Sequence, residues 1–239
     1  MKKLFKKFLN KLGYEINRLS PSTSISTRLQ YLFSHYKVDL VLDVGANVGA
    51  YVSLLRDFGY AGKVVSFEPL SSCYSILENL SQKDALWELA PRAAIGSEDG
   101  EIVINVSANS YSSSVLSMLD SHLNSAPNSG YVGSETVPLR RLDGLANQYL
   151  TEDFKSVYLK IDVQGFEWQV LQGAKNILPK INGIQLEISL IPLYEGQILF
   201  REMLDQMDDL GYEMYAIIPG FTDKVTGRLL QVDGVFFRK

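Results

Sequence analysis

The chain has one cysteine, Cys73, and only two histidines among its 239 residues. A single cysteine excludes an intramolecular disulfide, and so few thiol and imidazole groups argue against a cysteine or histidine metal centre. Apolar runs stay well below the roughly 20 residues of a membrane-spanning helix, and the apolar core and cleavage site of a signal peptide are missing. We therefore expect a cytoplasmic protein without a bound metal.

Acidic residues are scarce at the start of the chain and abundant afterwards. Residues 1–30 carry seven basic side chains and a single acidic one, Glu15. The whole chain has a net charge of -4, so residues 31–239 carry a net charge of -10. Such an acidic body excludes nucleic acid as an expected partner.

The basic opening segment has a helical pattern. Leu4, Phe5, Phe8, Leu9 and Leu12 recur at the spacing of one helix face, with lysines opposite them. Two interpretations remain open for this basic amphipathic helix. Its apolar stripe packs on the domain, or residues 1–14 make peripheral contact with an anionic membrane surface.

A glycine-bounded turn is the most informative segment. An apolar strand containing Asp43 ends before Gly45-Ala46-Asn47-Val48-Gly49, and a helix begins near Ala50. The first glycine permits backbone torsions closed to other residues, and the second lets the helix start close to a ligand. A dinucleotide site normally has a third glycine where Asn47 stands, because the pyrophosphate approaches the backbone there. S-adenosylmethionine has no phosphate, so Asn47 favours it over a nicotinamide dinucleotide.

The next strand ends in an acidic residue, Glu68, after Lys63 to Phe67. An acid at this point, roughly 20 residues after the turn, binds ribose hydroxyls in Rossmann-type sites. Because both candidate ligands contain a ribose, Glu68 predicts an adenosine ligand without choosing between them. A solvated strand-end acid is the simpler alternative.

Strands and helices alternate along the body, which predicts an α/β fold with a parallel sheet and helices on both faces. The last two strands have no helix between them, so we expect the final strand to be antiparallel. Strands are expected at 38–44, 63–67, 86–95, 102–106, 135–139, 156–163, 184–188, 213–218 and 229–237, and helices at 28–36, 50–58, 71–80, 142–150, 167–178 and 199–210.

The region between the second and fourth core strands is the least regular. Asp99-Gly100 lies between two apolar runs, 86–95 and 102–106, and predicts a hairpin between them. Residues 107–134 follow, with ten serines and three asparagines. A loop of this length inside a compact domain is usually functional or disordered. We interpret it as an acceptor-binding loop.

Six segments together resemble the FkbM family of methyltransferases, and the resemblance runs from about Leu40 to the C-terminus. They are Val41 to Gly49 with Tyr51, Phe67-Glu68-Pro69, Ala94-Ile95-Gly96, Leu159 to Glu167, Leu171-Gln172-Gly173-Ala174, and Tyr194-Glu195-Gly196-Gln197. The resemblance implies a Rossmann-like fold with a seven-stranded methyltransferase sheet, mostly parallel with an antiparallel last strand. It also implies S-adenosylmethionine as methyl donor and O-methylation of a small molecule or glycan. Many family members carry glutamate where this chain has Gln164.

The resemblance and the strand ends together give a set of expected donor contacts. These are Asp43, Gly45, Asn47, Gly49, Glu68, Ala94 and Asp162. Helix N–H groups in the turn favour the carboxylate of the donor's methionyl end, and a strand-end acid favours its ammonium group. A purely structural turn is the alternative.

Asp162 and Glu187 are the candidate catalytic residues, because methyl transfer to a hydroxyl requires a proton acceptor. Asp162 ends the central strand, where ligands bind in open α/β sheets, but it also lies two residues from Lys160 and so suits a structural ion pair. Glu187 lies on the next strand, and a solvent-facing acid is its alternative. His122 is a third candidate base, although a loop histidine without a visible partner is more often solvated.

We expect residues 1–37 to form an N-terminal basic amphipathic helix and a helical lead-in, and residues 38–239 to form one methyltransferase domain. Its function would be S-adenosylmethionine-dependent O-methylation, with Tyr111, Tyr131 and Tyr194 as candidate pocket aromatics. Two alternatives use the same residues. One is a nicotinamide-dependent oxidoreductase, and the other is a catalytically silent module that binds a membrane surface.

Overall fold

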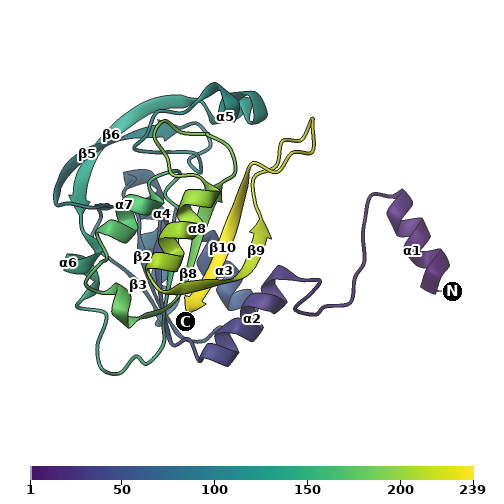
Figure 1. Cartoon of the computed structure of the whole chain (residues 1–239), viewed down its shortest axis with the longest axis horizontal. Helices are drawn as coiled ribbons and strands as arrows, with labels where there is room; N and C mark the ends of the chain where they lie inside the picture. The colour runs from purple at the N-terminus through teal and green to yellow at the C-terminus, as the bar shows by residue number, and fades with distance from the viewer. Residues whose placement is uncertain (1) are drawn as a thin grey trace.

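The computed structural model describes the backbone of residues 2–239 and the side chains of residues 5–239. Figure 1 shows a sheet-centred body from which the N-terminal segment projects. The helices are α1 (Lys2–Lys11), α2 (Ile25–Tyr36), α3 (Ala50–Asp57), α4 (Ser71–Ser81), α5 (Asp120–Ser125), α6 (Leu142–Ala146), α7 (Glu167–Gln172) and α8 (Phe200–Asp209), with short 3-10 helices at Pro127–Ser129 and Leu178–Lys180. The strands are β1 (Leu40–Val44), β2 (Lys63–Phe67), β3 (Trp87–Leu89), β4 (Ala94–Ile95), β5 (Gly100–Ser107), β6 (Tyr131–Arg140), β7 (Val157–Ile161), β8 (Ile181–Ser189), β9 (Tyr212–Pro219) and β10 (Gln231–Arg238).

Seven strands form the main sheet in the order β3-β2-β1-β7-β8-β10-β9. Strands β1, β2, β3, β7 and β8 pair in parallel, and β10 is antiparallel to both of its neighbours. The predicted sheet with an antiparallel last strand is therefore confirmed. Because β1 and β7 are neighbours in the middle of the sheet, their carboxyl ends open a crevice between them.

Helices cover both faces of this sheet, as expected. On one face, apolar residues of α2, α3 and α4 pack on alternate residues of β1, including Val41. On the other face, α6, α7 and α8 pack on Leu40, Leu42 and Val44 of the same strand. Full burial of a five-residue strand on both sides fixes β1, and with it the turn that follows, in the centre of the molecule.

Two expectations for the region after α4 are wrong. Residues 86–95 do not form one strand, since β3 belongs to the main sheet and β4 to a separate three-stranded sheet of order β4-β6-β5. Pro91 lies between them and has no N–H to continue the ladder. The hairpin expected around Asp99-Gly100 is also not formed, because β5 pairs with β6 in antiparallel fashion and β4 pairs with β6 in parallel.

The serine-rich region 107–134 is more ordered than a loop. Strand β5 extends to Ser107, β6 begins at Tyr131, and α5 lies between them. Its histidine, His122, is only 2% exposed and packs against the rings of Tyr194 and Phe221, each 5.2 Å away. The expectation of a solvated histidine is wrong. Burial lowers the pKa of His122 to about 4, so the ring is neutral near pH 7.

Several expected helix ends are also displaced. Helix α2 begins at Ile25, three residues early, because the side chain of Ser24 caps it by accepting the N–H of Thr27. Helices α6 and α7 end at Ala146 and Gln172, earlier than predicted. Helix α7 is followed by a turn at Gly173, where a side chain would collide with the backbone of Gly96.

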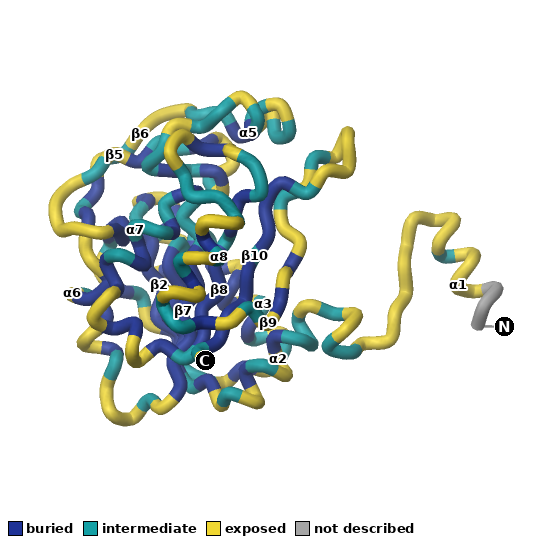
Figure 2. The backbone as a smooth tube through the Cα atoms, in the orientation of Figure 1, coloured by how far each residue is buried: buried dark blue, intermediate teal, exposed yellow. Residues whose placement is uncertain are grey.

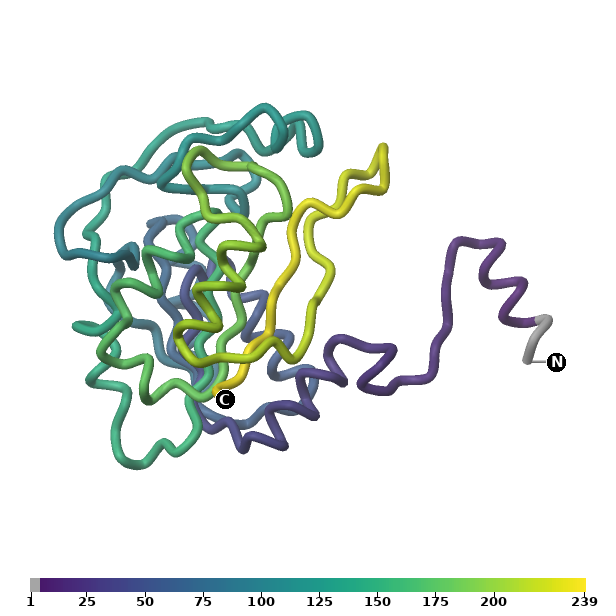
Figure 3. Tube along the Cα trace, in the orientation of Figure 1, coloured from purple at the N-terminus to yellow at the C-terminus, as the bar shows by residue number. Residues whose placement is uncertain are grey.

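Helix α1 lies apart from the body in Figures 1 and 3, joined to α2 by an extended segment. Figure 2 shows this helix and segment as mostly exposed. The described part of the apolar stripe, at Phe5, Phe8, Leu9 and Leu12, therefore does not pack on the domain, and the side chain of Leu4 lies outside the described residues. Within residues 2–239, no helix has both the length and the apolar character that crossing a bilayer requires.

Candidate active site

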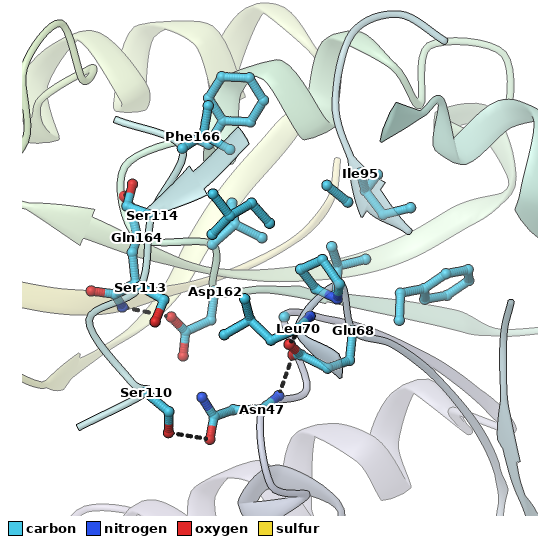
Figure 4. A pocket seen from close by; sticks show the side chains of 18 of the residues that line it. Asn47, Glu68, Leu70, Ile95, Ser110, Ser113, Ser114, Asp162, Gln164 and Phe166 are labelled. Carbon is cyan, nitrogen blue, oxygen red and sulfur yellow. Dashed lines mark hydrogen bonds between the residues drawn. The ribbon is translucent and has the colours of Figure 1, made fainter. Parts of the chain in front are cut away.

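A cavity of about 670 Å³ opens at the carboxyl ends of β1, β2 and β7 (Figure 4). The three-stranded sheet and the serine-rich segment after β5 form its other walls. Its lining includes Val44, Gly45, Asn47, Phe67, Glu68, Pro69, Leu70, Ala93, Ala94, Ile95, Ile104, Ser110, Tyr111, Ser113, Ser114, Val115, Asp162, Val163, Gln164 and Phe166.

The turn after β1 is held in torsions that its sequence permits. Gly45 has φ 78°, and a Cβ atom there would collide with the carbonyl oxygen of Asp162. Asn47 adopts φ 48°, a left-handed conformation that asparagine tolerates better than most residues. Gly49 caps α3 with φ 84° and faces the ring of Trp87, so it serves helix packing and does not line the cavity.

Glu68 lies at the cavity wall with its side chain tied to the backbone on both sides. Its Oε2 accepts the N–H of Asn47 at 2.8 Å, and its Oε1 accepts the N–H of Leu70 at 2.9 Å. Burial raises the pKa of Glu68 to about 7, although these two N–H groups act in the opposite direction. Each carboxylate oxygen keeps a second lone pair, so the pair of oxygens suits the two hydroxyls of a ribose.

Lys160 joins the strands beneath the cavity. Its Nζ lies 3.4 Å from Asp43 Oδ1 and 3.4 Å from Asp162 Oδ2, and it donates to the carbonyl oxygen of Gly45 at 3.3 Å. Burial alone would lower the pKa of Lys160, but the carboxylates of Asp162, Asp43 and Asp233 outweigh it and hold the pKa above its ordinary value. The lysine is therefore charged and ties the turn to the central strand.

Asp43 itself has no exposed surface. It accepts a hydrogen bond from Ser66 Oγ at 3.2 Å and does not line the cavity. Burial raises the pKa of Asp43 despite the neighbouring Lys160. Asp43, which was predicted to contact the donor, therefore lies one layer below the cavity and supports the turn through Lys160.

Gln164 links the two candidate catalytic acids. Its Nε2 donates to Asp162 Oδ1 at 2.8 Å and to Glu187 Oε2 at 2.7 Å, and Gln231 Nε2 also donates to Glu187 Oε2 at 2.7 Å. The hydroxyl of Tyr194 donates to Gln164 Oε1 at 2.8 Å and fixes the amide orientation. Burial, followed by the charges of nearby acids, raises the pKa of Glu187 well above its usual range.

The backbone at Gln164 has a left-handed torsion, and hydrogen bonds to Glu167 hold it in place. Gln164 has φ 58° and Gly165 has φ 97°. Glu167 Oε1 accepts the N–H groups of Val163 and Gly165, each at 3.1 Å, and burial raises the pKa of Glu167 to about 7. Glu167 therefore holds the turn that presents Asp162 and Gln164 to the cavity.

The serine-rich segment covers the cavity through specific bonds. Ser110 Oγ donates to Asn47 Oδ1 at 3.3 Å, and Ser114 Oγ donates to the carbonyl oxygen of Gln164 at 2.6 Å (Figure 4 shows the first). Tyr131 donates its hydroxyl to the carbonyl oxygen of Leu116 at 2.7 Å. The segment is thus bonded both to the glycine-bounded turn and to the turn after β7.

Five of the predicted site residues line one cavity, namely Gly45, Asn47, Glu68, Ala94 and Asp162. Asp43 and Gly49 lie behind its wall, and Glu187, which is partly exposed, is joined to the lining through Gln164. Among the candidate aromatics, Tyr111 lines the cavity and Tyr194 is fully buried beside it. Within the described part of the chain, no group of three or more histidine, cysteine, aspartate and glutamate side chains is arranged to hold a metal ion.

Sequence reasoning noticed Gln164 only as a departure from a family pattern and missed its bridging role. It also missed Ser110 and Ser114 as individual cavity residues. The Gln-Gly pair after the strand-end acid Asp162 indicates a turn. The contact of Gln164 with Glu187 on β8 depends on the pairing of β7 with β8, which the sequence does not specify.

Comparison with known proteins shows which family the chain belongs to. The model of the methyltransferase FkbM domain matches residues 43–214. The chain is 27% identical over 209 residues to the 2-O-methyltransferase NoeI of Sinorhizobium fredii (strain NBRC 101917 / NGR234), an alignment that covers 83% of each protein.

Two solved structures illustrate the structural comparisons. TehB from Haemophilus influenzae is 12% identical with a TM-score of 0.49, and the alignment covers 91% of this chain and 63% of that one. Magnesium protoporphyrin IX methyltransferase from Synechocystis PCC 6803 with bound SAM is 12% identical with a TM-score of 0.45, and the alignment covers 100% and 97%. Because the family model spans well over half of the sequence, methyl transfer is confirmed over hydride transfer, and the chain belongs to the FkbM family of S-adenosylmethionine-dependent methyltransferases.

Proposed function

We propose that the chain transfers the methyl group of S-adenosylmethionine to a hydroxyl oxygen of a small molecule or glycan. The observation that carries the proposal is the pair of acids, Asp162 and Glu187, held together by Gln164 at the wall of the cavity that also contains Glu68. The 27% identical relative bears the name of a 2-O-methyltransferase, which favours oxygen as the atom methylated.

The donor would lie between the glycine-bounded turn and Glu68. Its ribose suits the Glu68 carboxylate, and the apolar wall of Leu70, Ala94 and Ile95 suits a flat adenine ring. The bound donor supplies an activated methyl group on a sulfonium sulfur. The chain's own residues then have to align the acceptor and remove its proton.

Glu187 is the proposed proton acceptor and Gln164 its positioning residue. A carboxylate with a raised pKa is a stronger base than one with an ordinary pKa. As the acceptor oxygen bonds to the methyl carbon and the carbon–sulfur bond breaks, the hydroxyl proton passes to this carboxylate. Asp162, which faces the cavity, would orient the acceptor or the donor's ammonium group.

The serine-rich region 107–134 is proposed to contact the acceptor. Its residues Ser110, Tyr111 and Ser114 already line the cavity, and their hydroxyl groups suit a polar, uncharged acceptor such as a sugar. The acidic body gives no electrostatic attraction to anionic acceptors.

Calorimetric titration with S-adenosylhomocysteine tests the donor half of the proposal. Binding by the intact protein is expected, together with a large loss of affinity in Glu68→Ala. An intact, folded protein that does not bind S-adenosylhomocysteine would exclude the proposed site.

A screen that detects S-adenosylhomocysteine release tests the acceptor half. Candidate acceptors are neutral small molecules, sugars and lipid-linked glycans. With an acceptor in hand, Glu187→Gln is expected to reduce kcat by about 100-fold or more while S-adenosylhomocysteine affinity changes little. Equal kcat in the wild type and in Glu187→Gln would refute the role of Glu187.

A further inference from the structure

Helix α1 presents an apolar stripe that the rest of the chain does not cover. Phe5, Phe8 and Leu12 are 61%, 59% and 57% exposed, although each is a large apolar side chain. They lie three to four residues apart and so share one helix face. Contiguous exposed apolar patches on a protein surface commonly mark interaction sites.

The opposite face of α1 is basic. Lys6, Lys7 and Lys11 are exposed, and the helix contains no acidic residue. Residues 31–239 carry a net charge of -10, so the excess of positive charge lies in the segment that also carries the apolar stripe. A helix with one apolar and one lysine-rich face is complementary to a surface of anionic headgroups over an apolar layer.

We infer that α1 docks this protein on an anionic lipid surface. The apolar stripe would enter the boundary between headgroups and acyl chains, and the lysines would contact the headgroups. The segment between α1 and α2 fits this role, because Tyr14, Ile16 and Leu19 in it are also exposed, at 66%, 51% and 75%. Helix α1 spans ten residues, which lets it lie on a bilayer and not cross it.

Separation from the body also favours a lipid partner. Figures 1 and 2 show α1 and the segment after it projecting from the domain, and Figure 2 colours most of this part as exposed. A helix placed in this way can lie flat on a bilayer while the cavity remains open to an acceptor. Docking therefore requires no change in the domain itself.

Sedimentation of the full chain with lipid vesicles tests the inference. Vesicles made of equal parts of phosphatidylcholine and phosphatidylglycerol are expected to bind the protein, and vesicles of phosphatidylcholine alone are expected to bind it far more weakly. The triple variant Lys6→Gln, Lys7→Gln, Lys11→Gln should weaken binding about 100-fold, since each lysine near such a surface contributes about fivefold. Phe5→Ser with Phe8→Ser should weaken it as well, and added salt should release the wild type.

A matched control removes the same charge from the body. The triple variant Lys83→Gln, Lys175→Gln, Lys180→Gln changes three exposed lysines and should bind these vesicles as the wild type does. Binding of S-adenosylhomocysteine by every variant would verify that each is folded. Equal binding to both vesicle types, no binding by the intact chain, or binding unchanged by the α1 variants would overturn the inference. So would self-association through Phe5 and Phe8, detected by analytical ultracentrifugation without lipid.

Discussion

At Glu68, burial favours the protonated carboxyl group, whereas ribose binding favours the ionised one. Glu68 is 3% exposed and the pKa of its carboxyl group is raised to about 7, so a fraction of the free protein carries a proton there at neutral pH. Both oxygens of the ionised carboxylate accept from the two ribose hydroxyls, whereas protonation turns one of these oxygens into a donor. Donor binding should therefore release a proton and weaken as the pH falls below about 7, by up to about tenfold per pH unit.

Calorimetry with S-adenosylhomocysteine between about pH 6 and about pH 8 measures this dependence. Glu68→Gln cannot ionise and should bind weakly with little change over the same range. Asp43 and Lys160, the charged groups that also act on Glu68, remain in that variant and serve as its internal control. Affinity that increases toward lower pH in the wild type would contradict the assignment of Glu68 to the ribose.

Gln164 separates two acids that would otherwise repel each other. Its amide lies 2.8 Å from Asp162 Oδ1 and 2.7 Å from Glu187 Oε2. Gln164→Glu would replace two donated hydrogen bonds by a third carboxylate. We expect it to lower the free energy of unfolding by about 1–3 kcal/mol at alkaline pH, and by less at acidic pH, where a shared proton relieves the repulsion.

Urea denaturation of the Gln164→Glu variant at two pH values measures this effect. Gln148→Glu adds the same charge at an exposed position and should leave stability within about 0.5 kcal/mol of the wild type. If both variants lose the same amount at alkaline pH, added charge alone explains the result and the bridging role of Gln164 fails.

The turn between β1 and α3 depends on Gly45, and Gly59 provides a control for the backbone strain at that position. Gly45 and Gly59 have similar torsions, with φ 78° and 87°, but only Gly45 faces the carbonyl oxygen of Asp162, whereas Gly59 has open space around its Cα. Gly59→Ala should cost about 1–2 kcal/mol, the strain of a left-handed residue. Gly45→Ala should cost more than about 3 kcal/mol and abolish S-adenosylhomocysteine binding, because the backbone of the turn must move.

Thermal unfolding of the two variants compares these costs directly, and calorimetry reports on the site. If Gly45→Ala and Gly59→Ala lose the same stability and Gly45→Ala still binds S-adenosylhomocysteine, the close approach of Gly45 to Asp162 is not required.

The elements of the main sheet were predictable because each core strand is a short apolar run that ends at a polar or glycine residue. Leu40 to Val44 and Val157 to Ile161 are of this kind, and so the crevice at their ends was expected. The three-stranded sheet was not predicted, since the choice of β6 as partner for β5 depends on residues about 30 positions apart. The Asp99-Gly100 turn favoured a local hairpin, and tertiary pairing overrode it.

Residues of the site were predictable where a strand end fixes their position and were missed where a loop places them. Glu68 and Asp162 follow strands directly. Ser110 reaches Asn47 across 63 positions, and Tyr194 reaches Gln164 from a segment after β8, so neither contact has a local signal. His122 illustrates the same limit, because its burial comes from Tyr194 and Phe221, which lie far away in the sequence.

At the scale of the whole molecule, buried acids give stability an unusual dependence on pH. Glu68 and Glu167 have pKa values of about 7 in the folded protein against an ordinary value of 4.5. The folded state therefore binds more protons than the unfolded state between these values, and the stability from these groups is lost as the pH rises through about 7. His122 acts oppositely, since its pKa of about 4 against 6.5 removes stability only as the pH falls below 6.5.

These opposing contributions predict a maximum of stability on the acidic side of neutrality. Between about pH 6 and about pH 8, the two glutamates should lower the free energy of unfolding by about 3 kcal/mol in total, whereas His122 should raise it by about 1 kcal/mol, so the net loss is about 2 kcal/mol. Denaturant titrations at intervals across the range measure the change. The double variant Glu68→Gln, Glu167→Gln should have a shallower profile, because it removes two of the acids whose pKa values are raised. Saturating S-adenosylhomocysteine should stabilise the wild type more at the upper end, where Glu68 is already ionised. A wild-type protein that becomes more stable toward about pH 8 would mean that these carboxyl groups ionise without cost in the folded state, and that their burial does not set their pKa values.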